Sequence, residues 1–387
     1  MATKILSVDD EVDLEMLITQ FFRRQIRKGE YEFYFAHNGL EALKEMLKHP
    51  DIDIILSDIN MPEMDGLTLL ARIREMNNPA QKCIMVSAYG DMHNIRAAMN
   101  GGAFDFATKP IDMEDLAATI EKAREQIAFV RKSLEEHKEL NDIHSDLEAA
   151  KSIQQAIVPH VFPPFSDMTD RVDIFAHMQP AKDVGGDFYD LFKIDNDHVG
   201  FVMADVSGKG IPAAIFMAVS RTILRTKGIS SLNAAEVVEQ SNDMISYDSV
   251  NNMFVTVFYG IINVTTGDVQ YVNAGHNPPY ILHADGSIST VERTGGMALG
   301  LMEGIPFKCK TFTMSPGDML ICYTDGVTEA FNEAYEEYGE ERFEKLLPSI
   351  VGKSAEETCE AIKESVHEYA GEAPQSDDIT MMAIKRI

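Results

Sequence analysis

The sequence lacks the features that mark membrane and secreted proteins. A membrane-spanning helix needs about 20 mostly apolar residues in a row, and the sequence has no run of that kind. The N-terminus also lacks the charged stretch followed by a long apolar run that forms a secretory signal. We therefore expect a protein that does not associate with membranes and that is located in the cytoplasm.

Cysteine is scarce and basic residues are outnumbered. The four cysteines are far apart and form no Cys-x-x-Cys pair, which fits a reducing compartment. Lys and Arg together number 34 against 62 Asp and Glu, which gives a net charge of −28. Because nucleic-acid binding needs clustered Lys and Arg, and no such cluster is present, we expect no nucleic-acid partner. The length of 387 residues predicts two or three domains.

Acidic residues gather in four short clusters in the second half of the chain. Each places an aspartate next to a glycine, another aspartate or a tight turn at the end of a β-like run, and the four lie at 185–187, 204–210, 323–326 and 377–380. Carboxylates suit hard cations such as Mg²⁺ or Mn²⁺. A water shared by two such cations is a strong nucleophile near neutral pH. The set predicts a metal-dependent phosphoester hydrolase, although any single Asp-Gly pair is more often a hairpin turn.

Residues 2–125 alternate strand-like and helical patterns, which predicts a doubly wound parallel sheet with helices on both faces. Helices are expected at Glu11–Arg27 and Leu40–His49. The expected strands are Lys4–Val8, Tyr31–Ala36, Ile52–Ser57, Lys82–Ser87 and Phe104–Thr108.

Five polar side chains fall at the carboxyl ends of these strands, where ligand sites in such folds lie. They are Asp9, Asp10, Asp58, Ser87 and Lys109. Taken singly, the aspartates could be helix caps or turn residues. Together they resemble the receiver domain of two-component response regulators over residues 1–125.

The resemblance implies a role for each of these positions. Asp58 would be the phospho-accepting nucleophile, and Asp9 and Asp10 would hold a Mg²⁺ together with it. The phosphoryl group would be bound by Ser87 and Lys109. Three further expectations concern the partner and the neighbouring residues: a sensor histidine kinase as phosphodonor, Phe106 as the switching aromatic, and a cis peptide at Lys109–Pro110.

Residues 113–157 are helical and charged. Leu116, Ile120, Ala123, Ile127, Val130 and Leu134 keep heptad spacing, which favours a coiled coil or a helix paired with its twin. The register then breaks, and a new phase begins at Leu140 and continues through Ile143, Leu147, Ala150, Ile153 and Ile157. We expect a helical coiled-coil linker over residues 126–158 and a homodimer formed through it. An imperfect linker helix explains the pattern equally well.

From residue 168 the pattern is rich in strands, with helices at roughly 211–227, 233–248 and 354–370, the last opened by a Ser354/Glu357 capping box. This order predicts an α+β domain over 159–387, a β-sandwich flanked by helices. The expected strands are Val172–Met178, Val199–Ala204, Phe254–Asn263, Val269–Asn273, Tyr280–His283, Met319–Tyr323 and Ile379–Lys385.

The motifs of this region resemble the metal-dependent protein phosphatase (PPM) family, in its sporulation and stress-response branch. They are VGGDFYD at 184–190, ADVSGKGIPA at 204–213, YVNAGHNPP at 271–279, YTDGVTEA at 323–330 and DDIT at 377–380. The resemblance implies two Mn²⁺ or Mg²⁺ ions, with Asp187, Asp205, Asp325 and Asp377 as the catalytic metal carboxylates. The carbonyl of Val206 would be a further ligand. Asp378 is either an outer partner or interchangeable with Asp377.

The two resemblances together imply a response regulator whose output is a serine/threonine protein phosphatase. Phosphorylation of Asp58 would control it, and the substrate would be a phosphorylated anti-sigma-factor antagonist in a partner-switching circuit. The alternative is a non-enzymatic adaptor that sequesters a regulator protein. We interpret His276 as structural rather than catalytic, and Lys209 as a solvated turn residue unless it attracts phosphate.

Overall fold

The computed structural model describes residues 2–88, 91–247 and 253–387. The chain forms two compact units, Met1–Ile143 and His144–Ile387. The boundary between them lies inside one 45-residue helix, α6 (Met113–Ile157), whose limits agree with the helix expected at 113–157. Within the described ranges, no helix has both the length and the apolar character needed to cross a membrane.

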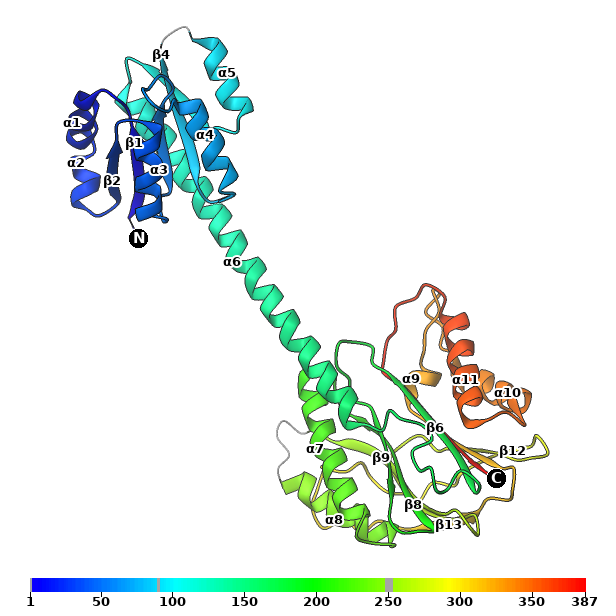
Figure 1. Cartoon of the computed structure of the whole chain (residues 1–387). Coiled ribbons are helices and arrows are strands. Elements are labelled where there is room, and N and C mark those ends of the chain that lie inside the picture. The colour runs from blue at the N-terminus through cyan, green and yellow to red at the C-terminus, as the bar shows by residue number, and fades with distance from the viewer. Residues whose placement is uncertain (1, 89–90, 248–252) are drawn as a thin grey trace. The chain divides into compact units, whose positions relative to one another are not determined.

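The N-terminal unit, which carries the labels α1 to α5 in Figure 1, is built on a parallel five-stranded sheet in the order β2-β1-β3-β4-β5. The strand order reverses between β1 and β3, and in sheets of this kind ligand sites lie at the carboxyl ends of the strands on either side of such a reversal. The strands are β1 (Thr3–Val8), β2 (Tyr31–Ala36), β3 (Ile54–Asp58), β4 (Lys82–Ala88) and β5 (Asp105–Lys109). The helices before α6 are α1 (Val12–Phe21), α2 (Arg23–Arg27), α3 (Gly39–Lys48), α4 (Gly66–Glu75) and α5 (Met92–Asn100). The predicted doubly wound fold is confirmed.

The helix expected at Glu11–Arg27 is divided into α1 and α2. Phe22 lies between them with φ −85° and ψ 10°, outside helical geometry. Its ring is fully buried and packs against Tyr31 and Phe33 of β2, with ring centroids 5.7 and 5.4 Å away. We attribute the break to this aromatic contact, which a periodicity of apolar residues does not reveal.

The two faces of this sheet carry separate apolar cores. One core joins the sheet to α3, α4 and α5. The other joins it to α1 and to the first turns of α6, through Leu116, Ile120, Ala123 and Ile127. These four α6 residues are at most 4% exposed. The expectation that they form a seam with a second helix is therefore corrected, because they pack on the sheet of their own chain.

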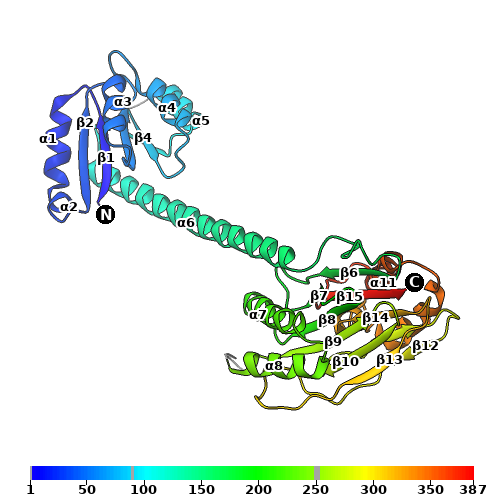
Figure 2. The same cartoon turned by 60° about the horizontal axis from the view of Figure 1, so that its bottom comes forward.

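The C-terminal unit contains two five-stranded antiparallel sheets, in the orders β13-β10-β9-β8-β7 and β12-β11-β14-β15-β6. Figure 2 shows β8, β9, β10 and β13 side by side. The first sheet consists of β7 (Phe188–Lys193), β8 (His198–Val206), β9 (Val255–Asn263), β10 (Asp268–Ala274) and β13 (Lys310–Thr313). The second consists of β6 (Val172–Gln179), β11 (Tyr280–Leu282), β12 (Ile288–Thr290), β14 (Met319–Tyr323) and β15 (Ile379–Arg386).

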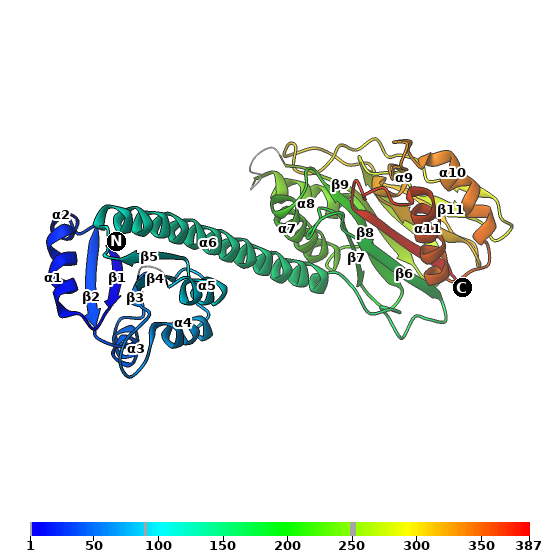
Figure 3. The same ribbon diagram turned by 90° about the horizontal axis from the view of Figure 1, so that it is seen from above.

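Helices cover both outer faces of this sandwich (Figure 3). One apolar core contains side chains from both sheets and from two helices, α7 (Ile211–Gly228) and α8 (Ala234–Tyr247). The other packs α10 (Gly339–Leu346) and α11 (Ala355–Ala370) on β11, β14 and β15. The predicted sandwich flanked by helices is confirmed, and so is the capping box at Ser354 and Glu357. Residue 248, the expected end of α8, lies outside the described residues.

Three strands of this unit escaped the sequence patterns. β7 is buried on both faces except at its last residue, so it shows no apolar–polar alternation, and it contains a charged residue, Asp190. That carboxylate is fully buried and is bound by Arg221 and Arg225 of α7 at 2.9 and 2.6 Å. β12 and β13 are short, half-exposed edge strands with little apolar periodicity.

Candidate functional site

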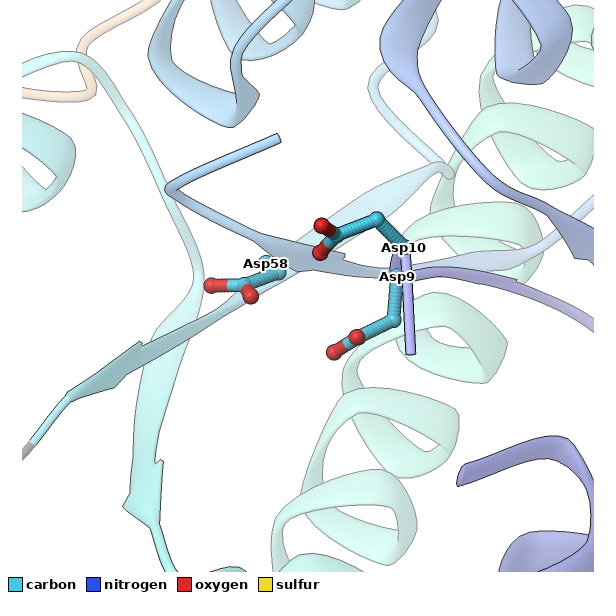
Figure 4. Close-up of side chains that lie close together, drawn as sticks. All are labelled: Asp9, Asp10 and Asp58. Carbon is cyan, nitrogen blue, oxygen red and sulfur yellow. The ribbon is translucent and has the colours of Figure 1, made fainter. Parts of the chain in front are cut away.

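Three aspartates meet at the carboxyl edge of the N-terminal sheet. Asp9 and Asp10 directly follow β1, and Asp58 is the last residue of β3, the strand paired with β1. Their carboxylate oxygens lie within 4.8 Å of one another, as the three converging side chains in Figure 4 show. Asp9 and Asp58 are each 6% exposed. Three oxygen ligands at one partly open point fit a single Mg²⁺, which keeps water in its remaining positions.

Lys109 reaches into the same point from the end of β5. Its ammonium group lies 2.7 Å from Asp58 and 2.9 Å from Asp9, and it also contacts Glu11 at 3.0 Å. Partial burial opposes the charge of Lys109, but its hydrogen bonds to these carboxylates outweigh burial and raise its pKa. Burial raises the pKa of Asp9, and the backbone N–H of Glu11 and the Lys109 ammonium offset this only in part. The predicted cis peptide at Lys109–Pro110 is present.

The remaining two residues expected at this edge are Ser87 and Phe106. Ser87 lies in β4, and its fully buried hydroxyl has no hydrogen-bond partner within residues 2–88, 91–247 and 253–387. A buried unpaired hydroxyl on β4, which pairs with the strand that ends at Lys109, suits an incoming phosphoryl oxygen. Phe106 in β5 is 36% exposed. Helix capping was the alternative role for Asp9. Its carboxylate does accept the N–H of Glu11, at the start of the first helix, at 2.9 Å, in addition to its place in the aspartate trio.

The C-terminal unit brings the expected phosphatase carboxylates together from four places in the fold. Asp187 immediately precedes β7, and Asp205 lies near the end of β8. Asp325 begins the short helix α9 (Asp325–Thr328), and Asp377 and Asp378 precede β15. Asp187 is 2% exposed and Asp378 8%, while the other three are half-buried. The fold thus brings together carboxylates that are far apart in sequence, such as Asp187 and Asp377, which are 190 positions apart.

Burial, and after it mutual repulsion, raises the pKa of three of these carboxylates. Burial, followed by the charges of Asp205 and Asp378, raises the pKa of Asp187 well above its usual range. Burial and the charge of Asp325 raise the pKa of Asp205 to about 7. Burial and the charge of Asp377 raise the pKa of Asp325. So much buried negative charge is costly without a cation to hold it ionised, and this donor set fits divalent metal.

The carboxylates of this site are more widely spaced than the N-terminal trio. Among the described residues, only Asp9, Asp10 and Asp58 place three ligand atoms within 4.8 Å of one another. Two cations about 3.5–4 Å apart take their ligands from a wider area than one cation does. The spacing is therefore compatible with the expected pair of cations.

Asp377 and Asp378 occupy different environments. Asp378 accepts the N–H of Ala181 at 2.8 Å through one oxygen, and those of Gly186 and Asp187 at 2.7 and 3.3 Å through the other. Asp377 is 33% exposed at its side chain and pairs with the Lys209 ammonium at 2.7 Å. Of the two roles left open by the sequence, this geometry favours the outer one for Asp378. Lys209 is about half exposed, as a turn residue would be, but it is also ion-paired beside the site.

Glycines allow the chain segments to approach closely around Asp378. A Cβ atom at Gly185 would lie 2.2 Å from a carboxylate oxygen of Asp378, and one at Gly326 would lie 1.9 Å from its carbonyl oxygen. The carbonyl of Val206, the expected further ligand, faces Gly186 in the same way at 2.9 Å. These distances leave no room for a side chain, which explains the glycines in the motifs.

His276 has a structural environment. It is 2% exposed, and its Nδ1 lies 2.9 Å from the hydroxyl of Thr256. Its backbone N–H and C=O are both bound by the side chain of Asn273. Burial lowers the pKa of His276 to about 4, so the ring is neutral near pH 7. The interpretation as a structural histidine agrees with this geometry.

Two buried residues that support the site escaped the sequence analysis. Thr324 is fully buried and its hydroxyl donates to Asp187 at 2.7 Å. The sequence feature that could have identified Thr324 is its position inside the YTDG motif. Gln154, in the last turn of α6, bonds both backbone groups of Gly185. Its signal was a glutamine seven residues after Leu147, where a heptad would place an apolar residue.

Comparison with known protein families agrees with this division of the chain. Residues 5–121 match the family described as response regulator receiver domain, and residues 195–387 match stage II sporulation protein E (SpoIIE). The chain is a receiver domain joined to a SpoIIE-type phosphatase domain. The SpoIIE match includes Asp205, Asp325 and Asp377, whereas Asp187 precedes it.

Individual relatives share parts of this arrangement. Protein IcfG of Synechocystis sp. is 33% identical over 62% of this chain, and phosphoserine phosphatase RsbU of Bacillus subtilis is 28% identical over 63%. The chain spans 41% of the length of IcfG and 71% of that of RsbU. The SiaA-PP2C domain of Pseudomonas aeruginosa aligns with a TM-score of 0.55 at 22% identity, covering 64% of this chain and 98% of that domain, and so shares the fold.

Proposed function

We propose that the SpoIIE-type domain is a Mn²⁺- or Mg²⁺-dependent phosphatase that hydrolyses phosphoserine or phosphothreonine in a partner protein. The observation that carries this proposal is the convergence of Asp187, Asp205, Asp325 and Asp377 at one point, with the pKa of three of them raised. The similarity to RsbU, which is named a phosphoserine phosphatase, supports the same substrate chemistry.

Each side chain in the site has a distinct task in this proposal. A pair of divalent cations, when bound, would supply an activated water and neutralise the phosphoryl oxygens. Asp187, Asp205, Asp325 and Asp377 would hold them, with the Val206 carbonyl as a further ligand. Thr324 orients the Asp187 carboxylate by donating to it. Lys209 supplies a positive charge beside Asp377, where it can assist the approach of a phosphorylated substrate.

A turnover assay on a phosphoserine peptide tests this proposal. The full chain should release phosphate with Mn²⁺ and lose activity when a chelator removes the metal. Asp187→Ala and Asp325→Ala should each abolish release, whereas Asp285→Ala should not. Asp285 is a suitable control because it lies in the exposed turn between β11 and β12 and its carboxylate accepts hydrogen bonds from Ser287 of that turn. Full activity of Asp187→Ala would contradict the assignment.

We further propose that a sensor histidine kinase phosphorylates Asp58 and thereby controls the phosphatase. Asp9 and Asp10 would hold a Mg²⁺ with Asp58, and Ser87 and Lys109 would bind the phosphoryl oxygens. The unpaired Ser87 hydroxyl and the short contact between Lys109 and Asp58 support these roles. Phe106, in the strand that ends at Lys109, would turn inward when Ser87 is engaged.

Beryllofluoride, a phosphoryl mimic, tests this control. We expect it to change phosphatase activity and to promote a homodimer through α6 in the wild-type chain. In Asp58→Ala both responses should be absent. Activity and sedimentation that remain unchanged in a chain with demonstrably loaded Asp58 would refute the proposed control.

The substrate that we propose is a phosphorylated anti-sigma-factor antagonist or a similar regulator protein in the cytoplasm. The PPM branch that the motifs resemble supports this class. A non-enzymatic adaptor is the competing function, and it would bind such a regulator without releasing phosphate. One experiment distinguishes the phosphatase from the adaptor. Asp325→Ala is used to trap phosphorylated partners, and the wild-type chain is then tested for its ability to dephosphorylate them. Binding without any turnover by the wild-type chain would favour the adaptor.

A further inference from the structure

Gln154 is a buried amide in an otherwise exposed part of α6. It is 5% exposed, whereas Ile153 before it is 66% exposed and Gln155 after it is also exposed. Its side-chain oxygen accepts the backbone N–H of Gly185 at 3.1 Å, and its side-chain N–H donates to the Gly185 carbonyl at 2.6 Å. One side chain therefore satisfies both polar backbone groups of a single buried residue.

Gly185 begins the segment that carries Asp187. The next two backbone N–H groups, of Gly186 and Asp187, donate to a carboxylate oxygen of Asp378. The segment is thus held by two side chains, Gln154 from α6 and Asp378 from the turn before β15. Because a Cβ atom at Gly185 would lie 2.2 Å from Asp378, the backbone rests directly on that carboxylate.

We infer that Gln154 is a positioning residue of the active site, an inference that rests on the proposed function only in assuming that Asp187 binds a cation. Gln154 fixes the Gly185 peptide, and the peptide fixes the point from which the Asp187 side chain extends. Removing the amide would leave the Gly185 N–H and C=O buried and unpaired, so the segment would shift to find water or other partners. Asp187 would move with it.

This inference makes the last turn of α6 part of the phosphatase site. A shift of α6 by one residue would carry Gln154 about 1.5 Å along the helix axis and turn it by about 100°. Either motion would break the short bond to the Gly185 carbonyl. Residues that orient metal ligands typically change metal affinity or activity about 10- to 100-fold when they are removed. We expect an effect in that range.

The test compares Gln154→Met with Gln155→Met in the full chain. Methionine keeps the length of the side chain but has no amide, and the exposed neighbour is a matched control. All proteins carry Asp10→Ala, so that the receiver site does not contribute to cation binding. Free Mn²⁺ is measured by its electron paramagnetic resonance signal during titration. Gln154→Met should bind Mn²⁺ about 10- to 100-fold more weakly, and Gln155→Met should match the parent.

Turnover measured in parallel distinguishes a positioning role of Gln154 from a general folding defect of the variant. With substrate at several concentrations and excess Mn²⁺, kcat of Gln154→Met should fall while KM stays within twofold of the parent. A folded Gln154→Met protein whose Mn²⁺ affinity and kcat both lie within twofold of the parent overturns the inference. If the parent chain releases no phosphate but Gln154→Met still weakens Mn²⁺ binding, the proposed function fails and the inference stands.

Hydrogen exchange on the wild-type chain keeps the inference testable even if Gln154→Met does not fold. The amide hydrogens of Gly185 and Gly186 should exchange far more slowly than that of Gly208, an exposed loop glycine of the same site region. Slow exchange supports the clamp. Exchange as fast as at Gly208 would show that neither Gln154 nor Asp378 holds the segment, and would overturn the inference.

Discussion

Replacing Asp378 by asparagine should destabilise the phosphatase domain, whereas the same change at Asp377 should leave its stability nearly unchanged. The two aspartates are adjacent in sequence but differ in their surroundings. Asp378 is 8% exposed, and both of its oxygens accept backbone N–H groups. Asp377 is a third exposed at its side chain, and its ion partner, Lys209, is 45% exposed.

The size of each effect follows from the bonds that are lost. An asparagine at 378 has one acceptor oxygen, so its NH₂ group must face either the Ala181 N–H or the pair from Gly186 and Asp187. At least one bond becomes a donor–donor contact, and the others lose their charge assistance. Hydrogen bonds to charged groups contribute about 1.5–3 kcal/mol each, so we expect a loss of about 2–4 kcal/mol. A half-exposed ion pair such as Asp377–Lys209 contributes about 0–1 kcal/mol.

Calorimetry of the metal-free chain measures both effects, with the receiver transition as an internal reference. For a domain of this size, 1 kcal/mol shifts the unfolding midpoint by about 2–4 °C, so Asp378→Asn should lower the second transition by about 4–16 °C. Asp377→Asn should shift it by less than about 4 °C and yet abolish Mn²⁺-dependent turnover. An Asp378→Asn protein with a normal midpoint and no turnover would refute this reasoning and identify Asp378 as the metal ligand.

Three further predictions concern packing elsewhere. Asp190→Ala should cost the phosphatase domain about 3–5 kcal/mol, seen as a lower unfolding midpoint, because it leaves two partly buried arginines without their shared carboxylate. Gly66→Ala should slow phosphorylation by acetyl phosphate about 100-fold, since its Cβ would lie 2.0 Å from the Asp58 carbonyl oxygen. Ile127→Ala should destabilise the receiver by about 2–5 kcal/mol, whereas Leu140→Ala, at a 65% exposed site, should leave stability unchanged and weaken self-association in sedimentation.

Much of the fold could be predicted because its signals are local. The receiver strands and the limits of α6 follow from periodicity, and the turn at Asp285-Gly286 is the hairpin that its sequence indicates. The misses have non-local causes. β7 is a buried strand whose buried charge, at Asp190, is neutralised by arginines about 30 residues away in sequence, and no local pattern shows that pairing. The break at Phe22 likewise depends on rings from another strand.

The candidate site divides in the same way. The aspartates could be named because each belongs to a motif whose chemistry is legible in sequence. The residues that orient them could not, because hydrogen bonds such as that from Thr324 to Asp187 join positions 137 residues apart. The distinction between Asp377 and Asp378 also required the structure, since it depends on which backbone N–H groups surround each carboxylate.

The middle of α6 gives a physical reason to expect a second copy of the chain. Residues 131–146 are all exposed, and they include the apolar side chains of Leu134, Leu140 and Ile143. Ion pairs along the helix, such as Lys132–Glu136 at 3.7 Å, contribute only about 0.2–0.5 kcal/mol each. Burial of one such leucine or isoleucine is worth about 1.5–3 kcal/mol.

A partner helix would therefore stabilise this stretch far more than its own charges do. The first part of the first heptad register, Leu116 to Ile127, cannot supply the contact, because it packs on the receiver sheet. Pairing would then use Leu134 and the phase that starts at Leu140, and a heptad step from Leu147 of this phase leads to Gln154. A dimer formed through this seam would fix the rotation of α6 immediately before the residue that holds Gly185. Self-association and the geometry of Asp187 would then be linked through one helix, which is why Leu140→Ala should also alter Mn²⁺ affinity if both proposals hold.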